Sequence, residues 1–452
     1  MTEPAIRPRW ALAGLALAML LSSLGTSVAN VALPTLEEAF GAPFGAVQWV
    51  VLAYLLAVTT LVVGAGRLGD LVGRRRLLVG GIATFTAASA ACAAAPALWL
   101  LVAARAVQGV GAAAMMALTL AFVAEAVPRG RTGAAMGLLG STSAIGTALG
   151  PSLGGALIAG PGWRAIFLVN VPLGLLALHL AHRHLPADRA RSAAGRPRFD
   201  VAGTALLAVA LGAYALAMTA GGAGPLAAGL LVAAAAAGLL AVAERRAEAP
   251  LISAALLRDG VLRAGVATSA IVSTVMMATL IVGPFHLSRA LGLGPALVGL
   301  VMSAGPAVVA ISGVPAGRIA DRLGARPVTL AGLAGMAVGT LLLAVLPARL
   351  GVAGYLGPIV VVTLGYALFQ TANNTAVMAG APADLRGVTS GMLNLSRNIG
   401  LVTGASVMGT VFALAGMHAT FAVAAALIGA GIALAGLSPR PGRRPRREPS
   451  PA

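Results

Sequence analysis

The chain has 452 residues, of which 59% are hydrophobic and only 10% are charged, and its mean hydropathy is +0.93. These proportions exclude a soluble globular protein, in which about a quarter of the residues are charged. All 31 basic residues are arginine, and they exceed the 13 acidic residues to give a formal net charge of +18. The single cysteine, Cys92, excludes a disulfide within the chain, and we find no cluster of residues suited to binding a metal.

Fourteen apolar runs, each long enough to cross a bilayer as a helix, occupy most of the chain. Because a helix satisfies its own backbone hydrogen bonds, the runs predict an all-α membrane protein. The predicted spans are 10–33, 46–66, 77–95, 98–124, 133–158, 165–181, 201–219, 225–243, 264–287, 295–316, 327–346, 352–379, 388–414 and 417–437.

The arginines are distributed unevenly between the two sides of the predicted membrane protein. By this assignment 26 lie in the tails and alternate loops, 3 in the other loops and 2 inside spans. Positive charge is retained on the cytoplasmic side, so we expect both termini in the cytoplasm. We expect the basic tail, 438–452, to meet anionic lipid headgroups rather than nucleic acid.

A repeat divides the chain into two parts. The run GRLGDLVGRRR begins at Gly66, and the similar run GRIADRLGARP begins at Gly317, 251 positions later. This offset covers eight predicted spans, which indicates two homologous six-helix bundles with two extra helices between them. The predicted domains are an N-terminal bundle (1–183), a linker with two extra transmembrane helices (184–263), a C-terminal bundle (264–437) and a basic cytoplasmic tail (438–452).

Three motifs follow in chain order. After the second span, the glycines of residues 66–76 allow a tight turn. Asp70 can cap the start of a helix, and Arg74 can pair with a carboxylate. The fourth span holds Arg105 and Gln108. A cation at the bilayer centre costs at least about 2.5 kcal/mol, so Arg105 must face protein or water. The fifth span carries small residues four apart and a proline, which permit close helix packing and a kink: Gly146, Gly150, Pro151, Gly154 and Gly155.

These motifs, with residues 30–34 (Asn-Val-Ala-Leu-Pro) and 393–398 (Leu-Asn-Leu-Ser-Arg-Asn), resemble the major facilitator superfamily and its fourteen-span drug:proton antiporter branch. The resemblance covers about residues 10–437. It implies a secondary active exporter of drugs or antibiotics that works by alternating access as a monomer in a bacterial plasma membrane. It also implies coupling to the proton gradient, with no cofactor.

The resemblance assigns roles to two of the motifs. The loop after span 2 is expected to latch the cytoplasmic side in the outward-facing state, and the glycine motif of span 5 is the antiporter motif of the branch. The residues of the latch are Asp70, Arg74 and Glu125, with Asp321 and Arg326 as the counterpart in the second half. Simpler interpretations remain open, namely a positively charged turn and ordinary small-residue packing.

The chain departs from the branch because no span centre holds a carboxylate. Inside the spans remain arginines and amides, which favour anionic, zwitterionic or neutral hydrogen-bonding solutes. The candidate residues for solute contact or coupling are Asn30, Arg105, Gln108, Gln370, Asn374 and Arg397. For Arg105, an alternative is a structural role in which it binds helix carbonyls and joins the first bundle together.

Other functions remain open at this stage. One is proton-independent export or exchange of an anionic metabolite, which would use the same fold. A weaker alternative from another class is a membrane-embedded enzyme that modifies lipid, although no constellation of catalytic residues is evident. ATP-driven export by this chain is excluded because the phosphate-binding loop needs a lysine and the chain has none.

Overall fold

The computed structural model describes residues 8–126, 132–186, 188, 200–220, 222–246, 259–346, 348–380 and 386–437. Every regular element in these ranges is a helix. The first group comprises α1 (Pro8–Phe40), α2 (Phe44–Val47), α3 (Trp49–Val72), α4 (Arg74–Ala94), α5 (Leu98–Ala126), α6 (Thr132–Ala159), α7 (Ala165–Leu168) and α8 (Asn170–His184). A hairpin follows, consisting of α9 (Val201–Thr219) and α10 (Ala223–Arg246). The last group comprises α11 (Gly260–Phe285), η3 (His286–Ala290), α12 (Pro295–Leu323), α13 (Ala325–Val345), η4 (Ala348–Leu350), α14 (Gly351–Gly380), α15 (Arg386–Thr403), η6 (Gly404–Met408) and α16 (Gly409–Leu437).

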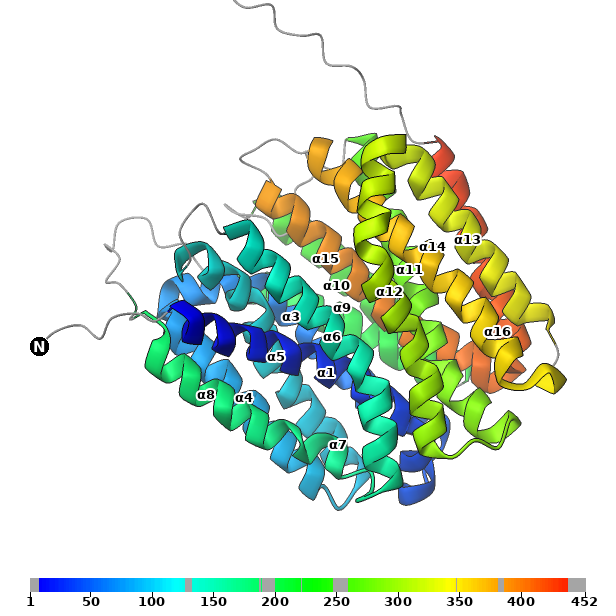
Figure 1. Ribbon diagram of the computed structural model, residues 1–452, viewed down its shortest axis with the longest axis horizontal. Helices are drawn as coiled ribbons and strands as arrows, with labels where there is room; N and C mark the ends of the chain where they lie inside the picture. Colours follow the sequence, from blue (N-terminus) through cyan, green and yellow to red (C-terminus); the bar gives the residue numbers. More distant parts are fainter. Residues whose placement is uncertain are drawn as a thin grey trace, which may run out of the picture.

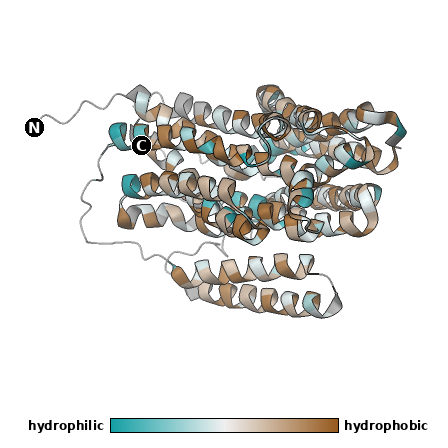
Figure 2. Cartoon of the chain, turned by 90° about the horizontal axis from the view of Figure 1, so that it is seen from below, coloured by the Kyte–Doolittle hydropathy of each residue, from teal (hydrophilic) through white to brown (hydrophobic). Residues whose placement is uncertain are grey.

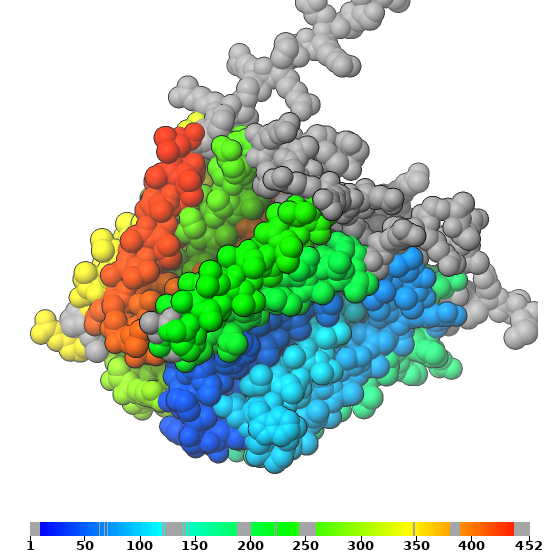
Figure 3. Space-filling model, turned by 180° about the vertical axis from the view of Figure 1, so that it is seen from behind, coloured from blue at the N-terminus to red at the C-terminus, as the bar shows by residue number. Residues whose placement is uncertain are grey.

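The helices form two bundles with the hairpin beside them. Helices α1–α8 pack mainly on one another, and so do α11–α16 (Figure 1). The α9–α10 hairpin is set apart from both bundles in Figure 2, and it lies across their junction in Figure 3. Helix α9 packs against α3 of one bundle and α15 of the other, whereas most of α10 is exposed.

Twelve of the described helical segments are long and apolar enough to cross a membrane, rather than the fourteen predicted. The difference arises at two places. The apolar part of α6 within the described residues is only Ile145–Ala159, and the segment Thr389–Leu437 counts as one although Gly416 has a non-helical backbone there. Helix α1 is also longer than predicted, because it continues through Pro34 to Phe40 at the cost of one backbone hydrogen bond.

Contacts between helix ends establish which ends lie together. Glu37 near the end of α1 contacts Arg289 of η3, which directly continues α11, so α1 and α11 also begin at one end of the molecule. The start of α13 binds the last turn of α16, where Arg326 donates to the Gly436 carbonyl oxygen. We call the end at which α1 begins and α16 finishes the tail end, and the other the opposite end. The bundles converge at the opposite end and splay apart toward the tail end (Figure 1).

The turns before α4 and α13 have the same geometry. Gly73 and Gly324, which are 251 positions apart, both have positive φ values, of 107° and 88°, that glycine adopts without steric cost. Close crossings of the following helices also correspond. A Cβ on Gly111 would lie 2.6 Å from the Gly81 carbonyl oxygen, and one on Gly365 would lie 2.6 Å from that of Gly332. The repeat in the sequence therefore reappears as matched turns and helix crossings.

Candidate functional site

Arg105 lies in the interior of the first bundle and is fully buried. Its Nε donates to the Val50 carbonyl oxygen at 2.9 Å, and its Nη1 donates to Gln108 Oε1 at 2.5 Å. Gln108 in turn donates to Ser89 Oγ at 2.7 Å, and the guanidinium lies 4.2 Å from the ring centre of Tyr54. Together these contacts join α3, α4 and α5. In this conformation Arg105 and Gln108 make structural contacts, while Arg105 Nη2 has no hydrogen-bond partner among the described residues.

Asn30 is also buried and only half satisfied. Its amide nitrogen donates to the Thr26 carbonyl oxygen of the preceding helical turn, and its Oδ1 has no partner in the described structure. A buried unpaired polar atom is rare in folded proteins and costs about 1–3 kcal/mol. Sequence reasoning missed a third such group, Gln48, whose Nε2 is unpaired at the junction of the two bundles.

The remaining candidate residues lie on the second bundle. Gln370 and Arg397 are half-buried, and Asn374 is exposed. The side chains of these three residues form no hydrogen bond with another residue within the described ranges. The structure therefore separates the six candidates into a buried group on α1 and α5 and an accessible group on α14 and α15.

The glycine motif of α6 has two packing faces. Gly146, Gly150 and Gly154 face α1, where a Cβ on Gly150 would lie 1.9 Å from Ser27 Oγ. Pro151 and Gly155 face α12 of the other bundle. A Cβ on Gly155 would lie 2.4 Å from the Pro295 carbonyl oxygen and 2.9 Å from Gly299 Cα. The motif thus brings two helix backbones from different bundles into direct contact near the opposite end.

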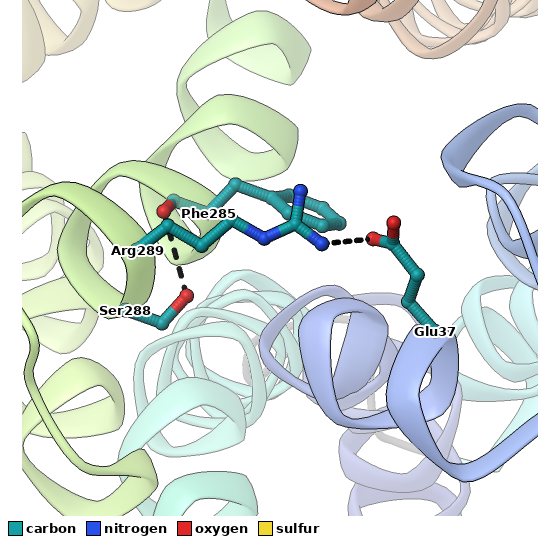
Figure 4. Close-up of polar contacts among 4 residues, drawn as sticks. All are labelled: Glu37, Phe285, Ser288 and Arg289. Carbon is teal, nitrogen blue, oxygen red and sulfur yellow. Dashed lines mark hydrogen bonds and ion pairs between the residues drawn. The ribbon is translucent and has the colours of Figure 1, made fainter. Parts of the chain in front are cut away.

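An ion pair also joins the bundles at the opposite end. Arg289 Nη2 lies 2.7 Å from Glu37 Oε2, and the Arg289 guanidinium lies 5.0 Å from the ring centre of Phe285 (Figure 4). The Glu37 side chain is 19% exposed and that of Arg289 is 56% exposed. The pair is therefore a contact at the rim of the interface and not a fully buried one.

Aromatic packing accompanies this ion pair. The Phe44 ring centre lies 4.9 Å from that of Phe285 and 5.7 Å from that of Phe412, in edge-to-face geometry. Gln48 packs so closely on Gly409 that a Cβ there would lie 2.1 Å from Gln48 Nε2. Sequence analysis did not identify these residues, because the partners lie on different halves of the chain and no spacing pattern relates them. The only available signal was the presence of glycine and aromatic residues at span ends.

At the tail end, the structure describes part of the predicted latch. The side chains of Asp70 and Glu125 lie outside the described part of the structure. Arg74 is half-buried at the start of α4, and Asp321 is exposed near the end of α12. A carboxylate that the sequence did not single out caps α4, because Asp188 accepts hydrogen bonds from the backbone nitrogens of residues 75 and 76.

Two helical bundles that converge at one end and splay at the other are the architecture of a membrane transporter that alternates between two openings. Comparison with known sequences agrees. The sequence model of the Major Facilitator Superfamily matches residues 15–405, with a second match over 265–452, and the chain belongs to this family. It is a multi-pass membrane transporter of small molecules, which removes the alternative of a lipid-modifying enzyme.

Three known proteins are similar in sequence to most of the chain. It is 35% identical to the multidrug resistance protein Stp of Mycobacterium tuberculosis, over 88% of this chain and 74% of that protein. It is 32% identical to the multidrug efflux pump LfrA of Mycolicibacterium smegmatis, over 89% of this chain and 80% of that protein. It is 30% identical to the riboflavin transporter RibZ of Clostridioides difficile, over 87% of this chain and 86% of that protein.

Proposed function

We propose that this chain exports drug- or antibiotic-like small molecules across a bacterial plasma membrane by alternating access, in exchange for protons. The observation that carries the proposal is the position of the glycine motif of α6, which packs on α1 with one face and on α12 of the other bundle with the second. A rigid, close contact of this kind at one end lets the bundles rock as bodies while the other end opens. The relatives named as multidrug resistance protein and multidrug efflux pump support drugs as the cargo.

We further propose fourteen spans with both termini in the cytoplasm. A single helix over the 49 residues of Thr389–Leu437 would measure about 74 Å, more than twice the hydrocarbon thickness. Its break at Gly416 supports two crossings there, and the 28 residues of α6, about 42 Å, support one more. An even number places both tails on one side, and the arginine excess at the tail end supports the cytoplasmic side. The conformation described would then be inward-facing.

The division into an N-terminal bundle (1–183), a linker hairpin (184–263) and a C-terminal bundle (264–437) forms part of this proposal. The protein would act as a monomer in contact with lipid. We propose Asp70, Arg74 and Glu125 as the latch of the outward-facing state, with Asp321 and Arg326 as its counterpart. Replacing Asp70 by Asn is then expected to slow transport without unfolding the protein.

Flux measurements test this function. Purified protein in liposomes is expected to move tetracycline, a fluorescent zwitterion, when a proton gradient is imposed, and a protonophore should abolish the movement. Protein-free liposomes with the same gradient are the control. Absence of tetracycline movement in correctly folded protein would contradict export, and movement that survives the protonophore would contradict proton coupling.

A second candidate is proton-independent export or exchange of an anionic metabolite. The similarity to a protein named as a riboflavin transporter favours a metabolite as cargo. A carboxylate-free membrane interior favours a mechanism without a proton carrier in the spans. A rapid pH jump outside preloaded liposomes separates the two candidates, because only a proton-coupled transporter changes its initial flux in proportion to the gradient.

A further inference from the structure

Helix α15 differs from the other long helices in having one strongly polar face. Ser390, Asn394, Arg397 and Asn398 follow one another at i, i+4, i+7 and i+8, the spacing of a single stripe on a helix. Asn394 is exposed and the other three are half-buried. In a membrane protein a polar stripe must face protein, water or a polar ligand, because lipid offers no hydrogen bonds.

Packing of α15 shows where the stripe lies. One face rests on α11, where Ser396 donates to the Val266 carbonyl oxygen and Gly400 approaches the Ala270 carbonyl oxygen. Another face carries Leu395, which packs with leucines of the α9–α10 hairpin and with Leu56 of α3. The polar stripe is on neither face. It lies between the side of Leu393, which is next to α11 and α14, and the side of Leu395, which is next to α3 of the first bundle. We infer from this position that the stripe borders the space between the bundles, which splay apart toward the tail end (Figure 1).

Helix α14 adds polar groups near the side that meets α11 and α15. Val377 of α14 lies in one apolar cluster with Leu262 of α11 and Leu393 of α15. Gln370 and Asn374 lie seven and three positions before Val377, on the same stripe of α14. Arg397 is eleven residues from the start of α15, or about 16 Å along the helix. That distance places the guanidinium near mid-depth of the proposed membrane span.

Arg397 has no anionic partner in the described structure. Its side chain makes no hydrogen bond or ion pair with another described residue. Four of the described carboxylates have other partners: Glu37 pairs with Arg289, and Asp188, Asp200 and Asp259 cap α4, α9 and α11. Glu38 and Asp321 are exposed near the ends of α1 and α12. No carboxylate of the sequence falls at a predicted span centre. The cation therefore has to be balanced by something other than a side chain at its own depth.

The matching positions of the first bundle carry no charge. Gly146 and Gly150 of α6 pack on α1 as Gly400 and Gly404 pack on α11, an offset of 254 residues. At this offset Arg397 corresponds to Ser143, whose hydroxyl is 2.7 Å from that of Ser23. The other span arginine, Arg105, is buried in its own bundle. The positive charge facing the space between the bundles is thus confined to one side.

We propose that Arg397, with Asn394 and Asn398 of α15 and Gln370 and Asn374 of α14, forms a site for an anionic group of the transported molecule, such as a carboxylate or an acidic phenol. The planar guanidinium binds two oxygens of such a group side by side, and the amides bind neighbouring polar atoms. The proposal rests on the proposed transport function and adds the charge class of the cargo. It accounts for an arginine kept at mid-depth without a carboxylate, because the cargo supplies the countercharge.

Binding of two dyes with one scaffold tests the site. Fluorescein is an anion and rhodamine 123 is a cation, and the binding of each dye can be measured by fluorescence anisotropy. In lipid nanodiscs the wild type is expected to prefer fluorescein. Arg397→Gln should weaken fluorescein binding by roughly tenfold to a hundredfold, the range for losing a charge-assisted hydrogen bond, and leave rhodamine 123 binding unchanged or tighter. Arg397→Lys should retain part of the affinity.

Controls separate this effect from misfolding and from general electrostatics. Arg349→Gln removes an equal charge at an exposed position of η4 and is expected to change fluorescein binding by less than about twofold. If Arg397→Gln does not fold, Asn394→Leu serves as the test variant. It keeps every charge and should weaken fluorescein binding to a smaller extent than expected for Arg397→Gln. A wild type that prefers rhodamine 123, or equal fluorescein affinity in folded Arg397→Gln and Arg349→Gln, would overturn the proposal. Failure of the transport function would instead show as an absence of gradient-driven tetracycline flux in the wild type, with fluorescein binding intact.

Discussion

Removing the ion pair between Glu37 and Arg289 is expected to shift the protein toward a state open at the opposite end. The pair connects the end of α1 to η3, which continues α11, with a 2.7 Å distance between Arg289 Nη2 and Glu37 Oε2 (Figure 4). This contact exists only while the bundles are closed there. The variant Glu37→Gln keeps the size of the side chain and removes its charge, so it tests the ion pair and not the packing.

The magnitude follows from the exposure of the two side chains. Exposed pairs contribute about 0.2–1 kcal/mol, whereas breaking a fully buried pair costs about 3–5 kcal/mol. With Glu37 19% exposed and Arg289 56% exposed, we expect the upper end of the first range, about 1 kcal/mol. A change of about 1 kcal/mol alters the ratio of closed to open molecules by about fivefold. The effect of Arg289→Gln should be larger, because it leaves the more buried carboxylate without a cation.

The single native cysteine makes the distance measurement direct. Cysteines that carry spin labels are introduced at Ala39 of α1 and Ala296 of α12 in a Cys92→Ala background; both positions are exposed and lie at the opposite end. Pulsed electron paramagnetic resonance then measures the separation of the bundles. Glu37→Gln should enlarge the long-distance population by about fivefold relative to the background. The charge-reversed double variant Glu37→Arg/Arg289→Glu should restore the short distance.

A double-mutant cycle gives the result that would refute the reasoning. If the two residues stabilise the closed end through each other, the double variant Glu37→Gln/Arg289→Gln shifts the populations no more than Arg289→Gln alone. Strictly additive shifts would mean that the residues act independently. An unchanged distance distribution in all three variants would mean that the ion pair has no influence on which end is open.

Three further predictions concern other contacts. Replacing Gly155 by Leu should reduce transport at least about tenfold while the protein stays folded by size exclusion, because a Cβ there would lie 2.4 Å from the Pro295 carbonyl oxygen and the opposite end cannot close; transport near the wild-type rate would disprove this. Arg105→Met should lower the free energy of unfolding by about 3 kcal/mol, since it removes hydrogen bonds made by a buried cation, and thermal unfolding in detergent checks it. Gly73→Ala should destabilise the protein by about 1 kcal/mol more than Gly324→Ala. Both substitutions place alanine at a positive φ, but only Gly73→Ala also displaces the Asp188 carboxylate that caps α4. Equal unfolding temperatures of the two variants would contradict this prediction.

Much of the architecture was predictable because it depends on local properties of the sequence. An apolar run of about twenty residues must become a helix in lipid, so the positions of α3, α4, α5, α9, α11 and α13 follow closely from hydropathy. The repeat of the Gly66 and Gly317 runs foretold matched turns, which appear at Gly73 and Gly324. Helix ends were less predictable, because the first span is predicted to end at residue 33 whereas α1 continues through Pro34 to Phe40.

The candidate site was predictable as a set of residue types but not as a constellation. The sequence identified Arg105 and Arg397 equally, as arginines inside spans. The structure separates them, because Arg105 is enclosed by α3, α4 and α5 while Arg397 remains on an accessible stripe. Which arginine is enclosed depends on how neighbouring helices are rotated about their axes, and no pattern within one helix contains that information.

By itself the sequence determined that the chain is a membrane-embedded set of helices, that it is built from a repeat, and that its interior lacks carboxylates, because these properties depend on composition and local spacing. Only the tertiary structure decided that Glu37 meets Arg289, that Gly155 meets Gly299, and that one end is closed while the other is splayed. Each of these is a contact or a spacing between residues on different halves of the chain. Such contacts arise from the packing of two bundles as bodies, and that packing is set by the sum of many weak surface contacts that no single segment encodes.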